Sequence, residues 1–543
     1  MKSIKTWPPW LAAILFLLAL CVYLLTLAPS ITWQHGGDDG GDLITATYNL
    51  GIPHPTGYPV YIMVGKLFTL LPWGDVAYRL NLMSAFFAAG AVAVVYLAIL
   101  TILRDAEDDP RSQLRPIVAA AIGSLILAFS PAFWSQAIIT EVYALNAFFL
   151  SLVILLMLRA GRLDQGLKGL SSPRISLWLL ALACGLSLGN HLLMLLFLPS
   201  VVIFLSLRCR RRFSVRDVVI ALVWFALGLL PYLYLPLRAG KNPMVNWGDP
   251  RDLEGFLWVV TAAPYQSMLF SLPFHQVIDR LLFWVSMIPQ QFTWIGVLLL
   301  VIGFWRSWEA DPPLALAFSI GLASNVIYTM NYPAANVQVY LVVSYQLMAI
   351  WLGMGLSHIF ELLQRQRTVE RVPEAYKGLL TSVVPISVLL PIFVLANNFP
   401  ALDLSSKHEA FDYGTEVLET VDHEAIIMSD DDRYTFTLWY FIHVLGERPD
   451  VIVLDARLLR WEWYRDNLDA FYPDLHAQAL DPKLGWSVAS LLEDVERDRP
   501  IYLTYEILLP PGYIMLPRGM LFAVQRDSTP VDSLTWHAFR NVV

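Results

Sequence analysis

Long apolar runs recur along the first 396 residues of this chain. A helix needs about 20 mostly apolar residues to cross the hydrocarbon core of a membrane. About eleven runs of suitable length cover approximately residues 9–29, 80–103, 115–133, 142–158, 175–189, 192–207, 217–236, 281–304, 313–330, 338–357 and 378–396. We therefore predict an α-helical polytopic membrane protein with a bundle of about eleven transmembrane helices.

The composition excludes several other classes of protein. Hydrophobic residues make up 57% of the 543 residues and charged residues only 15%, whereas soluble domains carry about 25% charged residues. A net charge of -8 argues against a nucleic-acid partner. Three cysteines lie in or beside apolar runs without a CxxC pair, so neither a disulfide framework nor a cysteine zinc site is expected: Cys21, Cys184 and Cys209.

The basic residues give a consistent orientation. Lys and Arg gather in the segment before the first run and after each even-numbered run, while the loops after odd-numbered runs are poor in both. Because basic loops stay in the cytoplasm, the N-terminus is predicted to be cytoplasmic. With eleven spans, the segment after residue 396 then lies outside. We expect an integral protein of the bacterial cytoplasmic membrane.

The tail at 397–543 has a different character from the membrane part at 1–396. It holds 25 of the 45 acidic residues but only 12 of the 37 basic ones. Its patterns predict strands at 425–429, 450–454 and 500–505, and helices at 434–445, 461–472 and 486–497. We interpret it as an extracytoplasmic α/β domain. Three acids at 430–432 follow a predicted strand, either as a ligand site or, more simply, as a solvated helix cap.

The first outer loop, residues 30–79, carries an unusual acidic cluster. Asp38, Asp39 and Asp42 lie among four glycines, which allow tight turns and close approach to a ligand. A carboxylate near an apolar wall has a raised pKa and can act as a base. The alternative is that these acids cap a helix over 43–50 and stay solvated. Further along the loop, a proline-stiffened turn projects His54 and Tyr58. The alternative is that this turn is purely structural.

Other polar side chains gather at the same predicted membrane face. Glu141 opens the fourth run, and His191 lies in a tight turn, although a helix-terminal acid and an ordinary buried histidine are simpler readings. Arg238 ends the seventh run, where it suits a lipid phosphate or merely reaches the headgroups. Trp247 and Asp249 follow on the same side. We discard a GxSxG match at 185–189, because it lies within an apolar run and lacks the strand that a nucleophile elbow requires.

Several of these segments resemble the protein O-mannosyltransferase-like family of the type C glycosyltransferase (GT-C) superfamily. The first-loop signature stands here as Asp39-Gly-Gly-Asp42-Leu43 and Gly51-Ile-Pro-His54-Pro-Thr-Gly-Tyr58-Pro59, with Thr56 in place of the usual proline. Weaker similarities are found in Glu141-Val-Tyr143, Tyr234-Leu-Pro-Leu-Arg238 and Trp247-Gly-Asp249-Pro250.

The resemblance implies a GT-C-like bundle whose first outer loop supplies the catalytic acid. The implied reaction transfers a sugar, with mannose as one candidate, from a polyprenyl-phosphate donor to a protein, lipid or glycan hydroxyl. Asp39 matches the family's first acid and Asp42 the second, and the choice of base between Asp38 and Asp39 stays open. Arg238 would hold the leaving phosphate. No cofactor or metal is expected if cations stabilise that charge, although a divalent metal stays an alternative.

A transporter or flippase for lipid-linked sugars is the main rival interpretation. Transporters place charged side chains near the middle of their spans. Here the runs are nearly free of acids, and the acids lie at the predicted outer ends. This distribution favours a reaction at the membrane surface.

Overall fold

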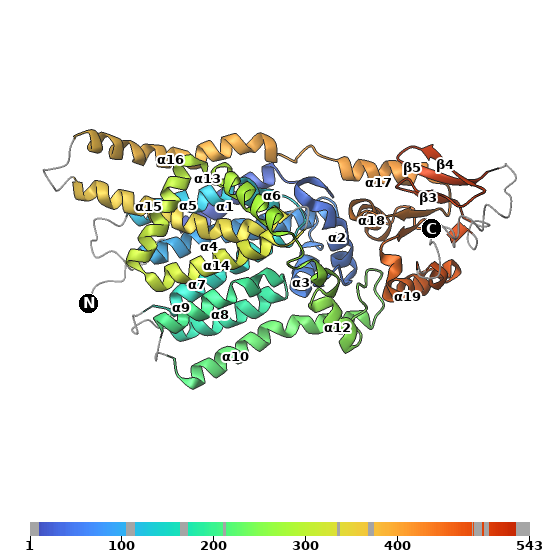
Figure 1. Cartoon of the computed structure of the whole chain (residues 1–543), viewed down its shortest axis with the longest axis horizontal. Coiled ribbons are helices and arrows are strands. Elements are labelled where there is room, and N and C mark those ends of the chain that lie inside the picture. Colours follow the sequence, from blue (N-terminus) through green and yellow to red (C-terminus); the bar gives the residue numbers. More distant parts are fainter. Residues whose placement is uncertain are drawn as a thin grey trace.

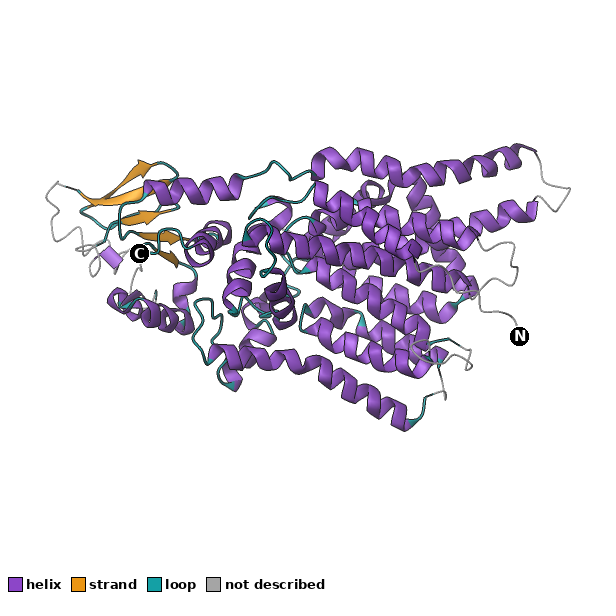
Figure 2. Cartoon of the chain, turned by 180° about the vertical axis from the view of Figure 1, so that it is seen from behind, coloured by secondary structure: helices purple, strands orange, loops and turns teal. Residues whose placement is uncertain are grey.

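The computed structural model describes residues 10–104, 114–162, 172–209, 213–333, 337–366, 374–480, 482, 491–492 and 499–527. A bundle of long helices forms most of the molecule, and a small α/β domain lies at one end of the bundle (Figure 1). Seen from behind, the strands are confined to that small domain (Figure 2). The predicted fold class is confirmed.

Each predicted apolar run coincides for most of its length with helical structure. The helices are α1 (Trp10–Leu25), α4 (Val76–Arg104), α5 (Leu114–Phe129), α6 (Pro131–Ala137), α7 (Tyr143–Ala160), α8 (Pro173–Leu188), α9 (Leu198–Arg208), α10 (Val215–Leu229), α11 (Tyr234–Ala239), α13 (Phe274–Ala310), α14 (Pro312–Met330), α15 (Val342–Gln366) and α16 (Glu374–Leu402). Helix α16 continues through the predicted boundary at residue 396.

Helix length and apolar composition give fewer spans than the eleven predicted. Among the described residues, seven helices are long and apolar enough to cross a membrane, or eight if α5 and α6, bent by 67°, form one broken span. Helices α1 and α8 and the segment Leu192–Arg208 are apolar but shorter. The count of eleven therefore stays a prediction.

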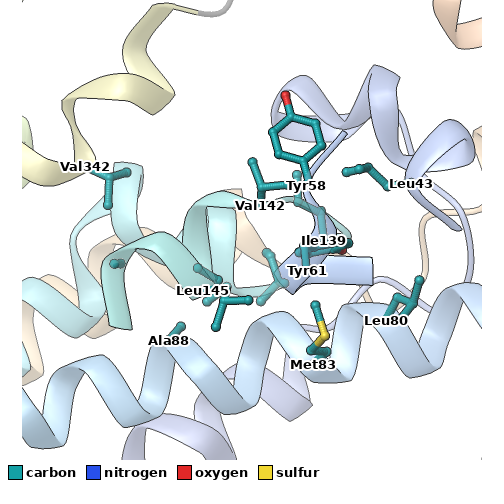
Figure 3. Close-up of a cluster of buried hydrophobic side chains, with 14 of the residues drawn as sticks. Leu43, Tyr58, Tyr61, Leu80, Met83, Ala88, Ile139, Val142, Leu145 and Val342 are labelled. Atoms are coloured by element: carbon teal, nitrogen blue, oxygen red, sulfur yellow. The ribbon is translucent and has the colours of Figure 1, made fainter. Parts of the chain in front are cut away.

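Short elements join successive helices of the bundle. They are η1 (Gln34–Asp39), α2 (Gly40–Asn49), α3 (Pro59–Phe68), η4 (Leu192–Leu196), η5 (Leu230–Leu233), α12 (Leu253–Val260), η6 (Ala263–Met268) and η7 (Val337–Leu341). Figure 3 shows the buried cluster beneath the first loop, where Leu43, Tyr58 and Tyr61 pack with Leu80 and Met83 of α4. Burial of these side chains fixes the loop to the bundle.

The α/β domain contains a five-stranded sheet in the order β2-β1-β3-β5-β4. Strands β1 (Ile426–Ser429), β2 (Ile452–Asp455) and β3 (Ile501–Leu503) are parallel, as expected for buried apolar runs joined by helices. They are accompanied by α17 (Glu409–Thr420), α18 (Asp432–Tyr440), η8 (Phe441–Leu445), η9 (Leu458–Arg460), α19 (Glu462–Phe471), η10 (Pro473–Leu475) and η11 (Ala477–Leu480).

Three predicted strands and two predicted helices of this domain are confirmed within a few residues. The antiparallel hairpin of β4 (Tyr513–Arg518) and β5 (Leu521–Arg526) was not predicted, although the two-residue turn Gly519-Met520 between alternating runs is a usable signal. The predicted helix at 486–497 lies outside the described residues except for Leu491 and Leu492.

The α/β domain is docked closely against the first outer loop. A Cβ atom on Gly41 of α2 would lie 2.2 Å from the carbonyl oxygen of Phe436 in α18, so a larger residue would separate the two helices. Trp33 donates from Nε1 to the Arg433 carbonyl at 3.2 Å and to the Thr437 hydroxyl at 3.0 Å. Gly41 of the first-loop motif thus has a packing role.

Candidate active site

Asp42 is the buried anchor of the first outer loop. Its side chain is fully buried, and Oδ2 accepts hydrogen bonds from the His54 backbone N–H at 2.9 Å and from His54 Nδ1 at 2.7 Å. Oδ1 accepts from Trp247 Nε1 at 3.2 Å. The carboxylate does not cap α2, which begins at Gly40. Asp42 therefore holds His54 in place and is not accessible to a substrate.

The loop carrying Trp247 is tied to the first loop through the backbone. Ile52 donates to the Val245 carbonyl at 2.8 Å, and Trp247 donates to the Ile52 carbonyl at 3.1 Å. A Cβ atom on Gly51 would lie 2.6 Å from the Val245 oxygen, so this approach requires glycine. The contact brings together two motifs separated by about 200 residues and sets the indole against Asp42.

His54 lies between two carboxylates. Its Nδ1 contacts Asp42, and its Nε2 lies 3.8 Å from Oδ2 of Asp39. Burial lowers the pKa of His54, but the charge of Asp39 and the hydrogen bond and charge of Asp42 outweigh burial and raise it to about 9. The imidazole is therefore protonated at neutral pH. Nε2 then donates to the Tyr58 hydroxyl at 3.1 Å, which in turn donates to the Pro55 carbonyl at 3.2 Å.

This arrangement makes protein stability depend on pH above neutrality. A pKa raised from 6.5 to about 9 means that the folded state holds the proton more tightly than the unfolded state. The stabilisation is complete below pH 6.5 and is lost as pH rises through about 9. Its upper limit is about 3 kcal/mol. Thermal unfolding of the wild type between pH 6 and 10 should show this loss, whereas His54→Gln should show a flatter curve; parallel curves would contradict it.

Asp38 and Asp39 differ sharply in their surroundings. The carboxylate of Asp38 lies 3.5 Å from Nε of Arg433, which belongs to the α/β domain. The Asp39 side chain is 43% exposed and lines a cavity of about 470 Å³. Burial within the surrounding protein raises the pKa of Asp39, and the charge of His54 opposes that effect. Of the two acids, Asp39 is the one available to a reacting group.

The cavity around Asp39 is rich in tyrosine and is apolar on one side. The residues that line it are Asp39, His54, Pro55, Thr56, Tyr58, Tyr143, His191, Leu192, Leu193, Leu195, Leu196, Thr261, Ala262, Tyr265, Gln266, Met268, Leu269, Tyr328, Tyr332, Tyr340 and Asp432. The described lining contains no Lys or Arg. A ligand with an apolar chain and a hydroxyl-rich or phosphate head suits this mixture.

His191 presents an uncharged donor to the cavity. Its Nδ1 accepts a hydrogen bond from the Leu193 backbone N–H at 3.0 Å, so the hydrogen of the neutral ring sits on Nε2. Burial, together with the positive charge on His54, lowers the pKa of His191 to about 3. The ring stacks on Tyr58, with centroids 6.0 Å apart, and tilts against Tyr143 at 5.5 Å. His191 is therefore a neutral hydrogen-bond donor at physiological pH.

Glu141 lies behind the cavity rather than at its surface. Its side chain is buried, and Oε2 accepts from the Val142 backbone N–H at 3.2 Å. Burial raises the pKa of Glu141 well above its ordinary value, and the negative charge of Asp39 adds to the effect. Tyr143, two residues on, does line the cavity. Glu141 thus influences the site electrostatically, without direct contact with the cavity.

Arg238 lies outside the cavity lining, in contrast to the predicted phosphate contact. Its Nε donates to the Leu50 carbonyl at 2.6 Å and its Nη2 to the Asn49 carbonyl at 3.1 Å, which are unpaired carbonyls at the end of α2. Asp249 is paired with Arg251 and accepts from Asn246 at 3.0 Å. Neither residue contacts the cavity in this structure, because both are engaged in holding loops.

The substitution Arg238→Ala tests this positioning role. Loss of two charge-assisted hydrogen bonds at the end of α2 should destabilise the protein by about 2 kcal/mol. Thermal unfolding measures that effect. The matched control is Arg251→Ala, which removes a half-exposed arginine that pairs with Asp249. A direct phosphate contact would instead weaken apparent donor affinity while leaving the unfolding temperature unchanged.

Two acids of the α/β domain fulfil the two roles that the sequence left open for residues 430–432. Asp431 caps α18 by accepting from Arg433 N at 3.0 Å, as predicted for a cap. Asp432 instead lines the cavity and accepts from Nη2 of Arg457 at 2.6 Å. Burial, with the negative charge of Asp39, raises the pKa of Asp432 to about 6 despite Arg457. Its position just past a strand of a parallel sheet was the available signal.

A group able to bind a metal is not found among the described residues: no three His, Cys, Asp or Glu side chains are arranged as candidate ligands.

The predicted site residues fall into two groups. Asp39, His54, Tyr58, Tyr143 and His191 meet at the cavity. The remaining predicted residues lie behind or beside it: Asp38, Asp42, Glu141, Arg238, Trp247 and Asp249.

Two family models match this chain. Residues 39–214 match the N-terminal domain of the protein O-mannosyl-transferase TMEM260, and residues 410–481 match TMEM260-associated domain 2. The mouse protein O-mannosyl-transferase TMEM260 is 25% identical over 487 residues, covering 84% of this chain and 64% of its own length. Its Dictyostelium discoideum counterpart is 24% identical over 539 residues, covering 90% and 63%. The chain thus spans less than two thirds of these relatives.

Solved structures share the fold at low sequence identity. ArnT from Cupriavidus metallidurans bound to undecaprenyl phosphate gives a TM-score of 0.58 at 12% identity, covering 95% of this chain and 97% of that one. The oligosaccharyltransferase of Archaeoglobus fulgidus gives 0.50 at 13% identity, covering 81% and 62%. The matched segments are thus similar to the protein O-mannosyl-transferase TMEM260 models and relatives, and the chain shares the fold of these two solved structures.

Proposed function

We propose that this chain is a membrane glycosyltransferase that transfers a sugar, with mannose as the first candidate, from a polyprenyl-phosphate donor to an acceptor hydroxyl. The observation that carries the proposal is the position of Asp39. Its carboxylate lines a cavity rich in tyrosine and lies beside the protonated His54. The similarity to the TMEM260 family models and the shared fold favour a transferase over the transporter alternative.

The proposed step begins with the acceptor hydroxyl hydrogen-bonded to Asp39. Asp39 takes the hydroxyl proton as the acceptor oxygen forms a bond to the anomeric carbon, and the bond from that carbon to the phosphate oxygen breaks. Polyprenyl phosphate leaves with the electron pair of the broken bond. A raised pKa suits Asp39 to receive a proton, since a more basic carboxylate is a better base.

Stabilisation of the leaving phosphate is assigned to donors of the cavity rather than to Arg238. The protonated His54 supplies positive charge, and His191 supplies a neutral N–H. Tyrosine hydroxyls of the lining add further hydrogen-bond donors for the leaving phosphate. The described lining around these groups carries no Lys or Arg, which makes His54 the principal cation there.

The apolar part of the cavity supports a lipid-linked donor. Leu192, Leu195 and Leu196 line one side, and Leu195 is 47% exposed. A polyprenyl chain is a continuous hydrocarbon and gains free energy by covering such surface. The related fold of ArnT, which was solved with undecaprenyl phosphate, is consistent with this donor class. The sugar and the acceptor, whether protein, lipid or glycan, are not specified by these contacts.

The proposed topology follows the sequence pattern. We place the N-terminus and the basic loops in the cytoplasm, and the Asp39 cavity and the α/β domain outside. The α/β domain lies at one end of the bundle, docked on the first outer loop, as this topology requires (Figure 1). The assignment to a bacterial cytoplasmic membrane stays a prediction, since the relatives given above come from a mouse and a slime mould.

Lipid extracts from cells that lack this chain test the proposal. If the chain consumes a polyprenyl-phosphate sugar, that lipid should accumulate and be identified by mass spectrometry. Complementation with the wild-type chain should return it to its normal level. The comparison uses a cell type whose wild type expresses the chain. If the lipid-linked sugars keep the same composition when the chain is removed, this result would count against the proposed donor.

A further inference from the structure

A second cavity lies where the first outer loop meets the α/β domain. It has a volume of about 510 Å³, and none of its lining residues lines the Asp39 cavity. Trp33 comes from the loop, Tyr413 from α17 and Tyr434 from α18, with Thr504 following β3. We propose that this cavity binds a saccharide. The proposal does not depend on the transfer reaction at Asp39.

The cavity contains a compact aromatic group. Trp33 lies 5.3 Å from Tyr413 and 5.7 Å from Tyr434 between ring centroids, and the two tyrosine rings stack at 4.8 Å. Each aromatic face is electron-rich and attracts the weakly positive C–H groups that a sugar ring presents on one side. Such a surface binds a pyranose without needing a charge on the ligand.

Two hydroxyl groups of the lining lack hydrogen-bond partners. The Tyr413 hydroxyl and Thr504 Oγ1 are buried and unpaired among the described residues, and Tyr413 is only 5% exposed. Buried polar groups are normally paired, and an unpaired one costs about 1–3 kcal/mol. A ligand hydroxyl both donates and accepts, so one sugar can satisfy both groups after small side-chain adjustments.

Carboxylates complete the lining. Glu409 and Asp412 of α17 are exposed, and Glu409 also accepts from Gln34 Nε2 at 3.3 Å. Ionised carboxylates accept hydrogen bonds from neighbouring hydroxyls on a sugar, and these charge-assisted bonds are stronger than neutral ones. The lining therefore combines an apolar platform with acceptors for several hydroxyl groups.

A cationic ligand fits the same residues less well. The guanidinium carbon of Arg433 already lies 5.8 Å from the centre of the Trp33 ring, so one side of the indole already has a cation next to it. An ammonium group carries only donors and leaves the hydroxyl hydrogens of Tyr413 and Thr504 unpaired. The observations therefore favour a neutral sugar over a lysine-containing peptide.

The position of the cavity suggests which substrate would use it. Trp33 and Asp39 are six residues apart in the chain, so their Cα atoms lie within about 20 Å of each other. If the proposed transfer is correct, a sugar in this cavity belongs to the acceptor, whose reacting hydroxyl reaches Asp39. This last statement rests on the proposed function, whereas the saccharide site itself does not.

Binding of methyl α-mannoside, methyl α-glucoside and methyl α-galactoside to the full chain tests the site. Saturation-transfer NMR is measured in lipid nanodiscs free of sugar-based detergent. At least one glycoside should bind saturably, and Tyr413→Phe and Thr504→Val should each weaken it by about threefold to tenfold. Tyr472→Phe, a hydroxyl deletion at the residue that follows α19 and lies outside the lining, is the matched control. Asp39→Asn should leave this binding unchanged even if it abolishes transfer.

Four outcomes would overturn the saccharide site. The first is that no glycoside binds saturably. The second is that both folded cavity variants, verified by thermal unfolding, bind like the wild type. The third is that Asp39→Asn removes the binding. The fourth is that Nα-acetyl-lysine amide, and not a glycoside, binds in a manner that depends on Tyr413. Failure of transfer with intact glycoside binding would overturn only the proposed reaction.

Discussion

Asp39→Asn should reduce sugar transfer by at least about 100-fold while the protein stays folded, because an amide cannot accept the acceptor proton. The substitution keeps the size of the side chain, and Asp39 is partly exposed to the cavity, so little packing is lost. Purified variant and wild type are compared in a transfer assay with a polyprenyl-phosphate sugar. Their unfolding temperatures are measured in the same preparations.

Asp38→Asn is the matched control for this experiment. It makes the same chemical change one residue earlier, at a carboxylate that is paired with Arg433 rather than facing the cavity. We expect transfer to fall by less than about tenfold, since a partly exposed ion pair contributes up to about 1 kcal/mol. The opposite ranking, with Asp38→Asn inactive and Asp39→Asn active, would assign the base to Asp38.

Asp42→Asn should cause the largest loss of stability among the outer-loop acids. The buried carboxylate accepts three hydrogen bonds, two of them from His54, and removing one partner of a buried ion pair costs about 3–5 kcal/mol. The pKa of His54 should fall toward its ordinary value, because the hydrogen bond and charge of Asp42 help to raise it. Transfer should fall as well, since His54 and Trp247 lose their common anchor.

Thermal unfolding and an NMR titration of the His54 ring measure these two effects. Asp249→Asn is the control, because Asp249 pairs with the more exposed Arg251, and the change should cost about 1 kcal/mol or less. A stability loss in Asp42→Asn no larger than in this control would show that Asp42 is not the anchor of the loop.

The membrane fold was predictable because its signal is local. A run of about 20 apolar residues identifies a helix without knowledge of its neighbours, and every predicted run is helical for most of its length. The same local reasoning located the three parallel strands of the tail. It missed the hairpin of β4 and β5, although two short apolar runs flank the turn Gly519-Met520.

The site was predictable only in part, because its geometry depends on contacts between distant segments. The sequence placed Arg238 at the end of a predicted span, but its partners are carbonyls at the end of α2, almost 190 residues earlier. Asp432 reaches the cavity only because α18 packs against Gly41. Asp38 and Asp39 are equivalent in the sequence, and the position of Arg433 distinguishes them.

The central claim is that Asp39 serves as the base for transfer from a lipid-linked sugar. The most direct measurement is single-turnover release of polyprenyl phosphate from a radiolabelled polyprenyl-phosphate mannose, with purified wild type and Asp39→Asn in nanodiscs and a cell-extract acceptor. The account predicts acceptor-dependent release by the wild type and release at least about 100-fold slower by the variant. Equal rates of acceptor-dependent release by the two proteins would contradict it.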